Sequence, residues 1–557
     1  MINPHSLTAT AFLFAYMALP LPAAAETASG APHAAPSVNT PAPEENALDK
    51  VAKLQRAGLL VAQGRTALEQ GRYPLAANIF GQALQLDPNN LMAAYGMGAA
   101  RLMEGAPAAA IPYFTRAASI DASYWPAYSG RGKAHFDTGD MAAAEADLRL
   151  ALSIRPEENK VRLMLADTLR GTGRGEEAAK EYAGVLDAIW QGQVSGGRNN
   201  ILFSSATIGA VLASRGEARF MAGQNEKAIE DFDSALEFTS RPEQALAGKG
   251  SALFAAGKLE ESEVALSSAI AITKTNPFYF VARGNTRLAL GNAAGAEEDF
   301  TSALALDSGM VMALANRSIA RKAQGHTGPA LEDLNAAIRL APSSSALYNN
   351  RGNLYLATGN AASSLKDYRA ALRLSPSSPQ AMSGEGASLV ELGKYREAVK
   401  ILDHAITAEP NYPPAYHNRA AARLEMGKYE EALADADMAL RLDKNDNSAQ
   451  VLRGIILFNL GRWSEGSRAV MEGRKYLENQ AAPDCALAFV DWTFNRATKP
   501  ALQKLRLCLS KGLYSRRMLV SPHQGGKFLK GMEKLPEYRE ILKTYPVRKP
   551  ADAIRQK

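Results

Sequence analysis

Two kinds of side chain occur at spacings that could support chemistry. Cys485 and Cys508 lie 23 residues apart and could form a disulfide. Arginine followed sixteen residues later by aspartate occurs six times, and a guanidinium group can bind a carboxylate through two parallel hydrogen bonds. These residues could therefore form ion pairs or, if the arginines gathered, bind an anionic ligand. The six combinations are Arg131 with Asp147, Arg215 with Asp231, Arg283 with Asp299, Arg317 with Asp333, Arg351 with Asp367, and Arg419 with Asp435.

The sequence contains no arrangement typical of an enzyme active site. The seven histidines are scattered singly, and no cluster of Cys and His has the spacing of metal ligands. Gly525, Gly526 and Lys527 are followed by Phe528 and lack the spacing of a phosphate-binding loop. We therefore predict no enzymatic activity, no metal and no cofactor.

The arginines and aspartates belong to a repeat of 34 residues. Around Gly352, two helix-like patterns are separated by Gly359 and Asn360, and steps of 34 residues from Gly352 reach a small residue each time. A turn glycine follows each of these anchors by seven residues. Four anchors precede a longer interval of 50 residues, and eight follow it. The anchors are Gly64, Gly98, Gly132, Ala166, Gly216, Gly250, Gly284, Ser318, Gly352, Gly386, Ala420 and Gly454.

This period and pattern resemble the tetratricopeptide repeat. In the unit around Gly352, Arg351 and Ser364 replace the usual Leu and Ala. The resemblance implies stacked helical hairpins, because a single hairpin leaves an apolar face exposed. We therefore predict an all-α superhelical solenoid of about twelve helix-turn-helix units. The residues that match the family pattern in this unit are Tyr348, Gly352, Tyr355, Tyr368, Ala371 and Pro376.

Composition predicts the remaining organisation. Residues 1–25 combine an apolar stretch with three alanines before Glu26, which predicts a cleaved signal peptide, with an uncleaved anchor as the alternative. Residues 26–50 are rich in Ala and Pro and predict a disordered linker. The longer interval could be a joint between two stacks or a loop that contacts a ligand. The predicted order is a first block at 57–188, an insertion or joint at 189–208, a second block at 209–480, and a basic helical cap at 481–557.

Comparison between the repeats favours ion pairs inside each hairpin. Where the aspartate is missing, the arginine is usually missing too, since Glu385 stands opposite Ile401 and Lys249 opposite Ala265. Arg453 is the one arginine that is kept without an aspartate, since the residue sixteen positions later is apolar. Pairing with the next repeat would instead set Asp367 against Glu385. We therefore predict that each pair joins the two helices of one hairpin, with an anionic-ligand site as the alternative.

The resemblance also implies a concave surface formed by the first helix of each hairpin. The position four residues after the anchor is mostly apolar, and its side chains could pack against the next repeat or contact a peptide. Amide groups on this surface can pair with an extended peptide backbone. The clamp of Lys and Asn by which some relatives hold a terminal carboxylate is not reproduced. The candidate groove residues are Asn285, Asn349, Asn353, Phe136, Phe220, Phe254 and Leu356.

The cysteines and the charge distribution concern the cap. Export would place Cys485 and Cys508 in an oxidising compartment, where we expect a disulfide, with two buried free thiols as the alternative. Residues 496–557 contain 16 Lys and Arg and 4 Asp and Glu, a net charge of +12 within a chain of net +6. This basic end could contact an anionic membrane surface, an acidic glycan or an acidic partner, or could be a solvated face. We expect no nucleic-acid partner.

These features predict an exported protein, either periplasmic or secreted. We expect a non-catalytic scaffold or adaptor in the cell envelope that binds a protein or an extended peptide on the concave face. The alternative is an assembly factor for envelope polysaccharide export or for secretion machinery, whose basic cap contacts membrane or glycan.

Overall fold

The computed structural model describes residues 47–192, 205–239, 241–475, 481–510 and 528–545. Within these ranges the chain forms 27 α-helices and one short 3₁₀ helix and contains no strand, which confirms the predicted all-α class. The chain divides into two compact units between Asn292 and Ala293. The predicted signal peptide and residues 26–46 of the predicted linker lie outside the described residues, and the first helix begins at Ala47.

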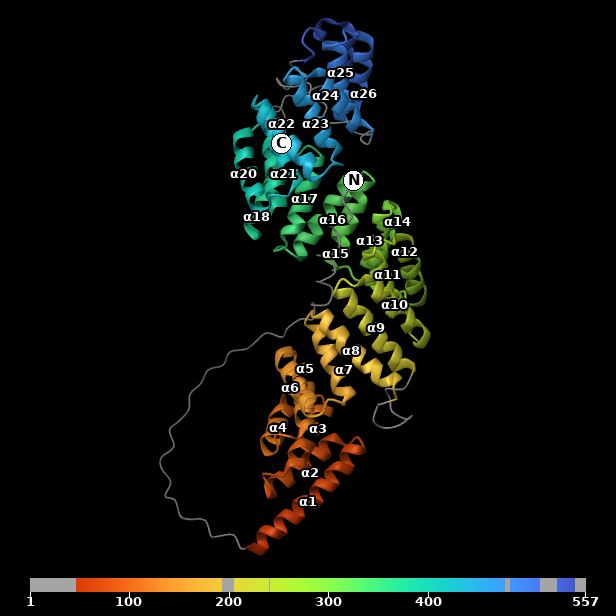
Figure 1. The fold of residues 1–557 in the computed structure, drawn as a ribbon, viewed down its shortest axis with the longest axis vertical. Helices are drawn as coiled ribbons and strands as arrows, with labels where there is room; N and C mark the ends of the chain where they lie inside the picture. Colours follow the sequence, from red (N-terminus) through yellow and green to blue (C-terminus); the bar gives the residue numbers. More distant parts are fainter. Residues whose placement is uncertain (1–46, 193–204, 240, 476–480, 511–527, 546–557) are drawn as a thin grey trace, which may run out of the picture. The chain divides into compact units, whose positions relative to one another are not determined.

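The first unit consists of helical hairpins followed by one further helix (Figure 1). Its helices are α1 (Ala47–Glu69), α2 (Tyr73–Leu86), α3 (Leu91–Met103), α4 (Pro107–Ile120), α5 (Trp125–Thr138), α6 (Met141–Ile154), α7 (Asn159–Gly171), α8 (Gly175–Trp190), α9 (Ser205–Met221), α10 (Asn225–Phe238), α11 (Pro242–Ala255), α12 (Leu259–Ile272) and α13 (Pro277–Ala289).

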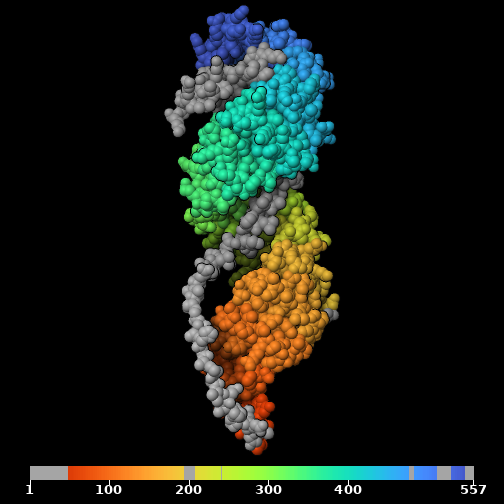
Figure 2. All heavy atoms as spheres, turned by 90° about the vertical axis from the view of Figure 1, so that its left-hand side faces the viewer, coloured from red at the N-terminus to blue at the C-terminus, as the bar shows by residue number. Residues whose placement is uncertain are grey.

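The second unit continues the hairpins and ends with the cap. In the space-filling view, neighbouring hairpins of this unit close up into a continuous surface (Figure 2). Its helices are α14 (Ala293–Leu306), α15 (Val311–Ala323), α16 (Thr327–Leu340), α17 (Ser345–Ala357), α18 (Ala361–Leu374), α19 (Pro379–Glu391), α20 (Tyr395–Ala408), α21 (Pro413–Glu425), α22 (Tyr429–Leu442), α23 (Asn447–Asn459), α24 (Trp463–Arg474), α25 (Ala481–Thr493), α26 (Thr498–Ser510), η4 (Met532–Lys534) and α29 (Pro536–Thr544).

The predicted turn glycines end the first helix of each hairpin. All twelve have a positive φ, between 72° and 84°, which glycine adopts at little cost. Each turn also has the hydrogen bond of a Schellman motif, as where the backbone N–H of Asn360 donates to the carbonyl oxygen of Tyr355 at 2.8 Å. The structure thereby confirms about twelve helix-turn-helix units. The twelve glycines are Gly71, Gly105, Gly139, Gly173, Gly223, Gly257, Gly291, Gly325, Gly359, Gly393, Gly427 and Gly461.

A large side chain of the second helix fills the space between two successive first helices. Tyr368 on α18 lies between Gly352 on α17 and Gly384 on α19, where a Cβ atom would come within 3.1 and 2.2 Å of its ring. The sequence comparison identified the anchor glycine but missed the second one. That second glycine follows the ring by sixteen residues in four hairpins, which are Phe80 with Gly96, Phe114 with Gly130, Phe232 with Gly248, and Tyr368 with Gly384.

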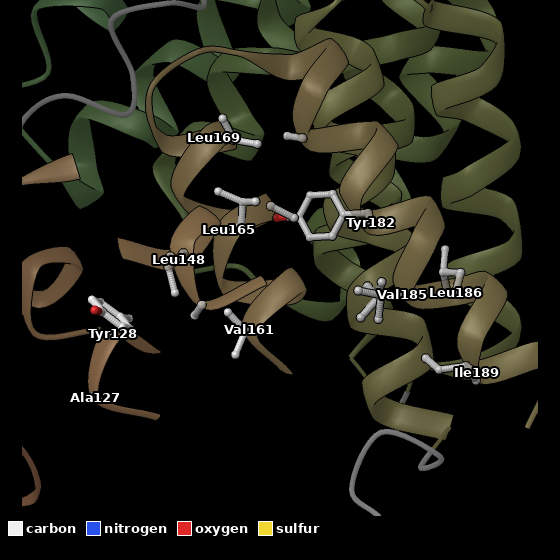
Figure 3. Packing of buried hydrophobic residues seen from close by; sticks show 14 of the residues in the cluster. Ala127, Tyr128, Leu148, Val161, Leu165, Leu169, Tyr182, Val185, Leu186 and Ile189 are labelled. Carbon is white, nitrogen blue, oxygen red and sulfur yellow. The ribbon is translucent and has the colours of Figure 1, made fainter. Parts of the chain in front are cut away.

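The most extensive apolar cluster of the first unit continues past the predicted insertion. Tyr182 of α8 is fully buried and directed toward Leu165 of α7 (Figure 3). Beyond it, α8 packs against α9, although residues 193–204 between these helices lie outside the described ranges. The hairpins on both sides of the longer interval therefore belong to the same stack.

The cap covers the apolar end of the last repeat. Phe458 of α23 is buried, and its ring stacks on Trp463 with their centroids 5.2 Å apart. The ring of Phe528 packs edge-on against both, with its centroid 6.4 Å from that of Phe458 and 5.5 Å from that of Trp463. Cys485 of α25 and Cys508 of α26 are buried as a pair with their Cα atoms 5.1 Å apart, within the range that a disulfide requires.

None of the described helices combines the length and the apolar composition needed to cross a membrane.

The contact between Tyr368 and Gly384 generates a stability prediction. Gly384→Ala places a methyl group against the buried ring and should reduce the free energy of unfolding by about 1–3 kcal/mol because the site is overpacked. The control is Gly328→Ala in α16, where an added Cβ meets nothing within 4 Å. Urea denaturation followed by circular dichroism measures both. Equal effects of the two substitutions would contradict the proposed packing.

The cysteine pair generates a second prediction. We expect no titratable thiol in denatured, unreduced protein taken from its native compartment. The bridge would link α25 and α26 through cysteines that are 23 residues apart in sequence. Its reduction should lower the free energy of unfolding by about 3 kcal/mol in the chain-entropy model. Hydrogen exchange should then rise in the cap before it rises in the repeats. Two free thiols per chain would contradict this prediction.

Candidate peptide-binding surface

The first helices of the hairpins, which are the odd-numbered helices α1 to α23, form a shared surface within each unit. Most successive first helices contact one another in addition to their own second helix, as α17 contacts α19 and α19 contacts α21. Within the described residues, successive second helices make no contact of similar extent. Each stack is therefore tighter on the side of the first helices, which is the concave side of a curved solenoid.

Three of the predicted groove residues lie on α17. Asn353 is exposed, and its Oδ1 accepts a hydrogen bond of 2.7 Å from the Tyr368 hydroxyl. This bond fixes the amide, and its Nδ2 group has no partner in the described part of the chain. Asn349 and Leu356 are partly buried. The Oδ1 atom of Asn349 is buried and has no hydrogen-bond partner among the described residues.

The position of Asn349 is polar in the next two repeats as well. Ser383 on α19 accepts a hydrogen bond of 3.0 Å from the Asn418 side chain. His417 on α21 has a buried Nδ1 atom without a hydrogen-bond partner among the described residues, and the nearest carboxylate oxygen, of Asp446, lies 3.7 Å away. Burial lowers the pKa of His417, since it disfavours the charged imidazolium. The imidazole is therefore neutral at pH 7.

The remaining predicted groove residues lie in the first unit. Phe136, Phe220 and Phe254 are all partly buried and occupy the same position on α5, α9 and α11. Lys133 lies over the ring of Phe136, 5.9 Å from its centroid. Asn285 on α13 is partly buried too. The phenylalanines thus retain exposed ring surface, so both uses predicted for them, packing and peptide contact, stay open.

Two basic residues interrupt the apolar position. Arg170 is held by the Glu217 carboxylate at 2.7 Å and by the Tyr182 hydroxyl at 3.1 Å. Burial raises the pKa of Glu217 despite this neighbour. Lys322 on α15 is exposed, but the surrounding protein partly dehydrates its ammonium group and lowers its pKa. Lys322 has no ion-pair partner within the described ranges.

The structure places five of the six predicted Arg and Asp combinations in contact. In each, the arginine Nη2 donates to Oδ1 of the aspartate inside the same hairpin, and the aspartate side chain is at most 9% exposed. The sixth combination, Arg283 and Asp299, is divided between the two units. The five Nη2 to Oδ1 distances are 2.7 Å for Arg131 and Asp147, 2.6 Å for Arg215 and Asp231, 2.7 Å for Arg317 and Asp333, 2.7 Å for Arg351 and Asp367, and 2.6 Å for Arg419 and Asp435.

Four of these arginines, Arg131, Arg317, Arg351 and Arg419, also contact the preceding hairpin, which the sequence comparison missed. Nη1 of Arg351 donates to Oδ1 of Asn335 at 2.7 Å, and Nη1 of Arg419 donates to Oδ1 of Asp403 at 2.6 Å. In both cases the acceptor lies sixteen residues before the arginine. One guanidinium group therefore joins three helices, and its hydrogen bond to Asp367 raises the pKa of Arg351. Geometry of this kind supports a structural use of these arginines rather than an anion site.

Three of the repeats that lack the combination of arginine with a later aspartate have another charged arrangement before the anchor. Among the described residues, the side chain at that position, which is Lys249, Glu385 or Arg453, bonds only to the preceding hairpin. Glu385 accepts from Arg369 at 2.8 Å, so the charges are reversed there. Lys249 and Arg453 donate to aspartates of the preceding second helix, at 2.5 and 2.6 Å. The sequence analysis identified no partner for these three positions, because their partners lie sixteen residues before them rather than after. The partners are Asp233, Arg369 and Asp437.

Among the described side chains, no group of three or more His, Cys, Asp or Glu is placed to hold a metal ion.

The fold and this surface define a class, a solenoid of helical hairpins with a polar and apolar inner face. The chain belongs to the tetratricopeptide repeat family. One model of this repeat matches residues 61–126, 127–192, 316–379 and 417–466, and a second matches residues 355–424. Together these matches cover just over half of the chain.

Solved structures of similar architecture include the APC/C hetero-tetramer Cut9-Hcn1, with 13% identity, coverage of 90% of this chain and 99% of that chain, and a TM-score of 0.46. Yeast Tom70 is 16% identical; the match covers 86% of this chain and 99% of that chain, with a TM-score of 0.36. A tetratricopeptide repeat protein from Parabacteroides merdae is 24% identical; the match covers 42% of this chain and 92% of that chain, with a TM-score of 0.38. No curated protein matches the chain in the corresponding comparison.

The ion pair of Arg351 generates a prediction. Asp367→Ala leaves a largely buried guanidinium group without its carboxylate and should cost about 2–3 kcal/mol of unfolding free energy. The double variant Asp367→Ala with Arg351→Leu should be more stable than that single variant, because no charge is left unpaired. Chemical denaturation of the four proteins of this cycle measures the coupling. Additive effects would show that the pair contributes no coupling energy.

Proposed function

We propose that this protein is a non-catalytic scaffold that binds a protein or an extended peptide on the inner surface formed by its first helices. We further propose that it acts in the cell envelope after export, as the composition of residues 1–25 predicts. The solenoid fold supports the general part of this proposal, because stacked hairpins create extended concave surfaces suited to binding other chains. Partner and location are the parts that require experiment.

The observation that carries the proposal concerns two of the five buried side-chain polar atoms that have no hydrogen-bond partner in the described part of the chain. These two, Oδ1 of Asn349 on α17 and Nδ1 of His417 on α21, occupy the same repeat position two hairpins apart. A buried polar atom without a hydrogen bond costs about 1–3 kcal/mol, so its retention on an inner surface favours use by a ligand. Lys322, with its partly dehydrated ammonium group, would favour a ligand that brings a carboxylate to α15.

An extended polypeptide fits the spacing of these groups. Packed helices lie about 8–10 Å apart, which is close to the rise of three extended residues at about 3.3 Å each. Successive first helices would then meet peptide groups about three residues apart. A backbone N–H of the ligand would donate to Asn349, and the Nδ2 group of Asn353 would donate to a carbonyl oxygen. Leu356 would contact an apolar side chain.

A second candidate function is an assembly factor for polysaccharide export or secretion whose cap contacts membrane or glycan. The cap exposes Arg496, Lys499 and Arg506. Phe494, which follows α25, is 56% exposed, and Leu507 on α26 is 42% exposed. Basic residues beside exposed apolar side chains favour anionic surfaces. Binding to vesicles of anionic lipid and to an acidic polysaccharide, each compared with a neutral counterpart, would support this candidate.

The test of the proposal uses Asn349→Leu. Linear peptides are first selected from a random library on the purified chain, and their affinities are measured by fluorescence anisotropy. Replacing the unpartnered amide by an apolar group of similar size should leave the melting temperature unchanged or raise it. The same substitution should weaken peptide binding about tenfold, which corresponds to one lost hydrogen bond of about 1.4 kcal/mol.

The matched control is Lys366→Ala, which changes an exposed residue on the second helix of the same hairpin. This variant should bind the selected peptides as the unchanged chain does. If Asn349→Leu and Lys366→Ala bind equally well, or if the library yields no binder, the inner surface of α17 is not the binding site.

A further inference from the structure

One second helix differs from the others on its outer face. The residue fourteen positions after the anchor is exposed in every hairpin, and Val264 on α12 is the only branched apolar residue among them. The Val264 side chain is 67% exposed. The corresponding residues are Asn78, Pro112, Ala146, Lys180, Glu230, Val264, Glu298, Glu332, Lys366, Lys400, Ala434 and Arg468.

The outer face of α12 carries an uncharged stretch beside two adjoining hollows, both of which are lined by Val264 and Ser268. No charged residue occurs from Val264 to Thr273, and Ile272 at the end of the helix is 52% exposed. One hollow of about 470 Å³ is lined by residues from Glu263 to Ala271. The other, of about 410 Å³, lies between α11 and α12 and is lined by Leu246 and Leu253 together with the charged residues Lys249, Glu260 and Glu261. Hollows beside an apolar ridge can receive the ridge of another helix.

Charges of opposite sign lie at the two ends of this ridge. Glu260 and Glu261 are exposed in the first turn of α12, and Lys274 is exposed just after its last turn. None of these three side chains has an ion-pair partner among the residues that the structure describes. Charged groups at both ends of an apolar strip are typical of the polar rim around an interface core.

The sequence of α12 is self-complementary about its middle. Glu260 lies seven residues before Ser267, and Lys274 lies seven residues after it. A second α12 laid antiparallel, with a two-fold axis at Ser267, would bring Lys274 of the second copy to Glu260. In that register Val264 would lie opposite Ile270 of the second copy, next to the exposed Ala271. Such self-complementarity is what a two-fold dimer interface requires.

We propose that this protein associates with a second copy of itself through antiparallel pairing of the two α12 helices. The small side chains of Ser267, Ser268 and Ala271 allow the helices to approach closely at the crossing. Val264 of each copy enters a hollow of the other. This outer face is separate from the inner surface proposed to bind peptide, so the dimer would present two such surfaces.

The pairing is expected to be weak. Two four-turn helices bury less than the roughly 1,200 Å² at the lower limit of a standard interface. We therefore expect a dissociation constant of about 10–100 µM. Sedimentation velocity of the full chain over that concentration range should show a reversible shift from the mass of one chain to that of two.

Three variants test the interface. Val264→Lys replaces the apolar side chain at the centre of the interface with an ammonium group in each copy and should weaken association about tenfold or more. Leu340→Lys changes a side chain of similar character, 53% exposed on α16, and should leave association unchanged. Glu260→Lys with Glu261→Lys should also weaken the dimer, and the addition of Lys274→Glu should restore it. Because these residues are exposed, circular dichroism should show the same melting temperature for all variants.

Cysteine crosslinking fixes the register. Ser268→Cys, next to the predicted two-fold axis, should form an intermolecular disulfide under mild oxidation. Ala370→Cys, at the corresponding position of α18, should not. A chain that stays monomeric throughout the concentration range overturns the proposal. A dimer that Val264→Lys does not weaken, or equal crosslinking at the two positions, also overturns it.

Discussion

The array depends on a close approach of helix backbones, which allows one bulky side chain to fill the space between three helices. The Tyr368 ring can lie between α17 and α19 only because Gly352 and Gly384 carry no Cβ atom toward it. Hairpins with a smaller residue at the ring position do not need the second glycine, as where Leu402 is followed sixteen residues later by Asn418. A ring and the second glycine therefore occur together in four hairpins, where the close packing leaves no room for a Cβ atom. The buried ring of Phe300, which is followed sixteen residues later by Asn316, shows that this glycine does not accompany every ring.

The ion pairs follow from the same stacking. Bringing helices together removes water from the position before the anchor, and a charge there needs partners in a fixed geometry. Arg351 meets this requirement with Asp367 in its own hairpin and Asn335 in the preceding one. Glu385 meets it with reversed charges through Arg369. The requirement is thus for a satisfied polar group that joins neighbouring hairpins, and an arginine with its aspartate is one of several solutions.

Local features were predictable from the sequence, and contacts between repeats were less so. The glycines at Gly359 and its counterparts mark every turn, because a positive φ selects glycine. The pairing of Arg351 with Asp367 was accessible because both residues recur together. The second glycine at Gly384 and the backward partner of Glu385 were missed, because both belong to contacts with a neighbouring hairpin. The partnerless state of the Asn349 amide cannot be predicted from sequence, since it depends on what surrounds the side chain.

The two faces of each hairpin satisfy their polar groups in different ways, and this difference guides the functional interpretation. The arginines between the hairpins have partners on two neighbouring helices, so they are committed to stability. On the inner surface, Asn349 and His417 retain buried polar atoms without hydrogen-bond partners among the described residues. An array that satisfies its buried charges through Arg351 and Asp367 gains no stability from an unpaired amide oxygen two residues away on the same helix. Such an amide is better explained by a ligand than by folding, and this supports the proposed binding surface on α17 to α21.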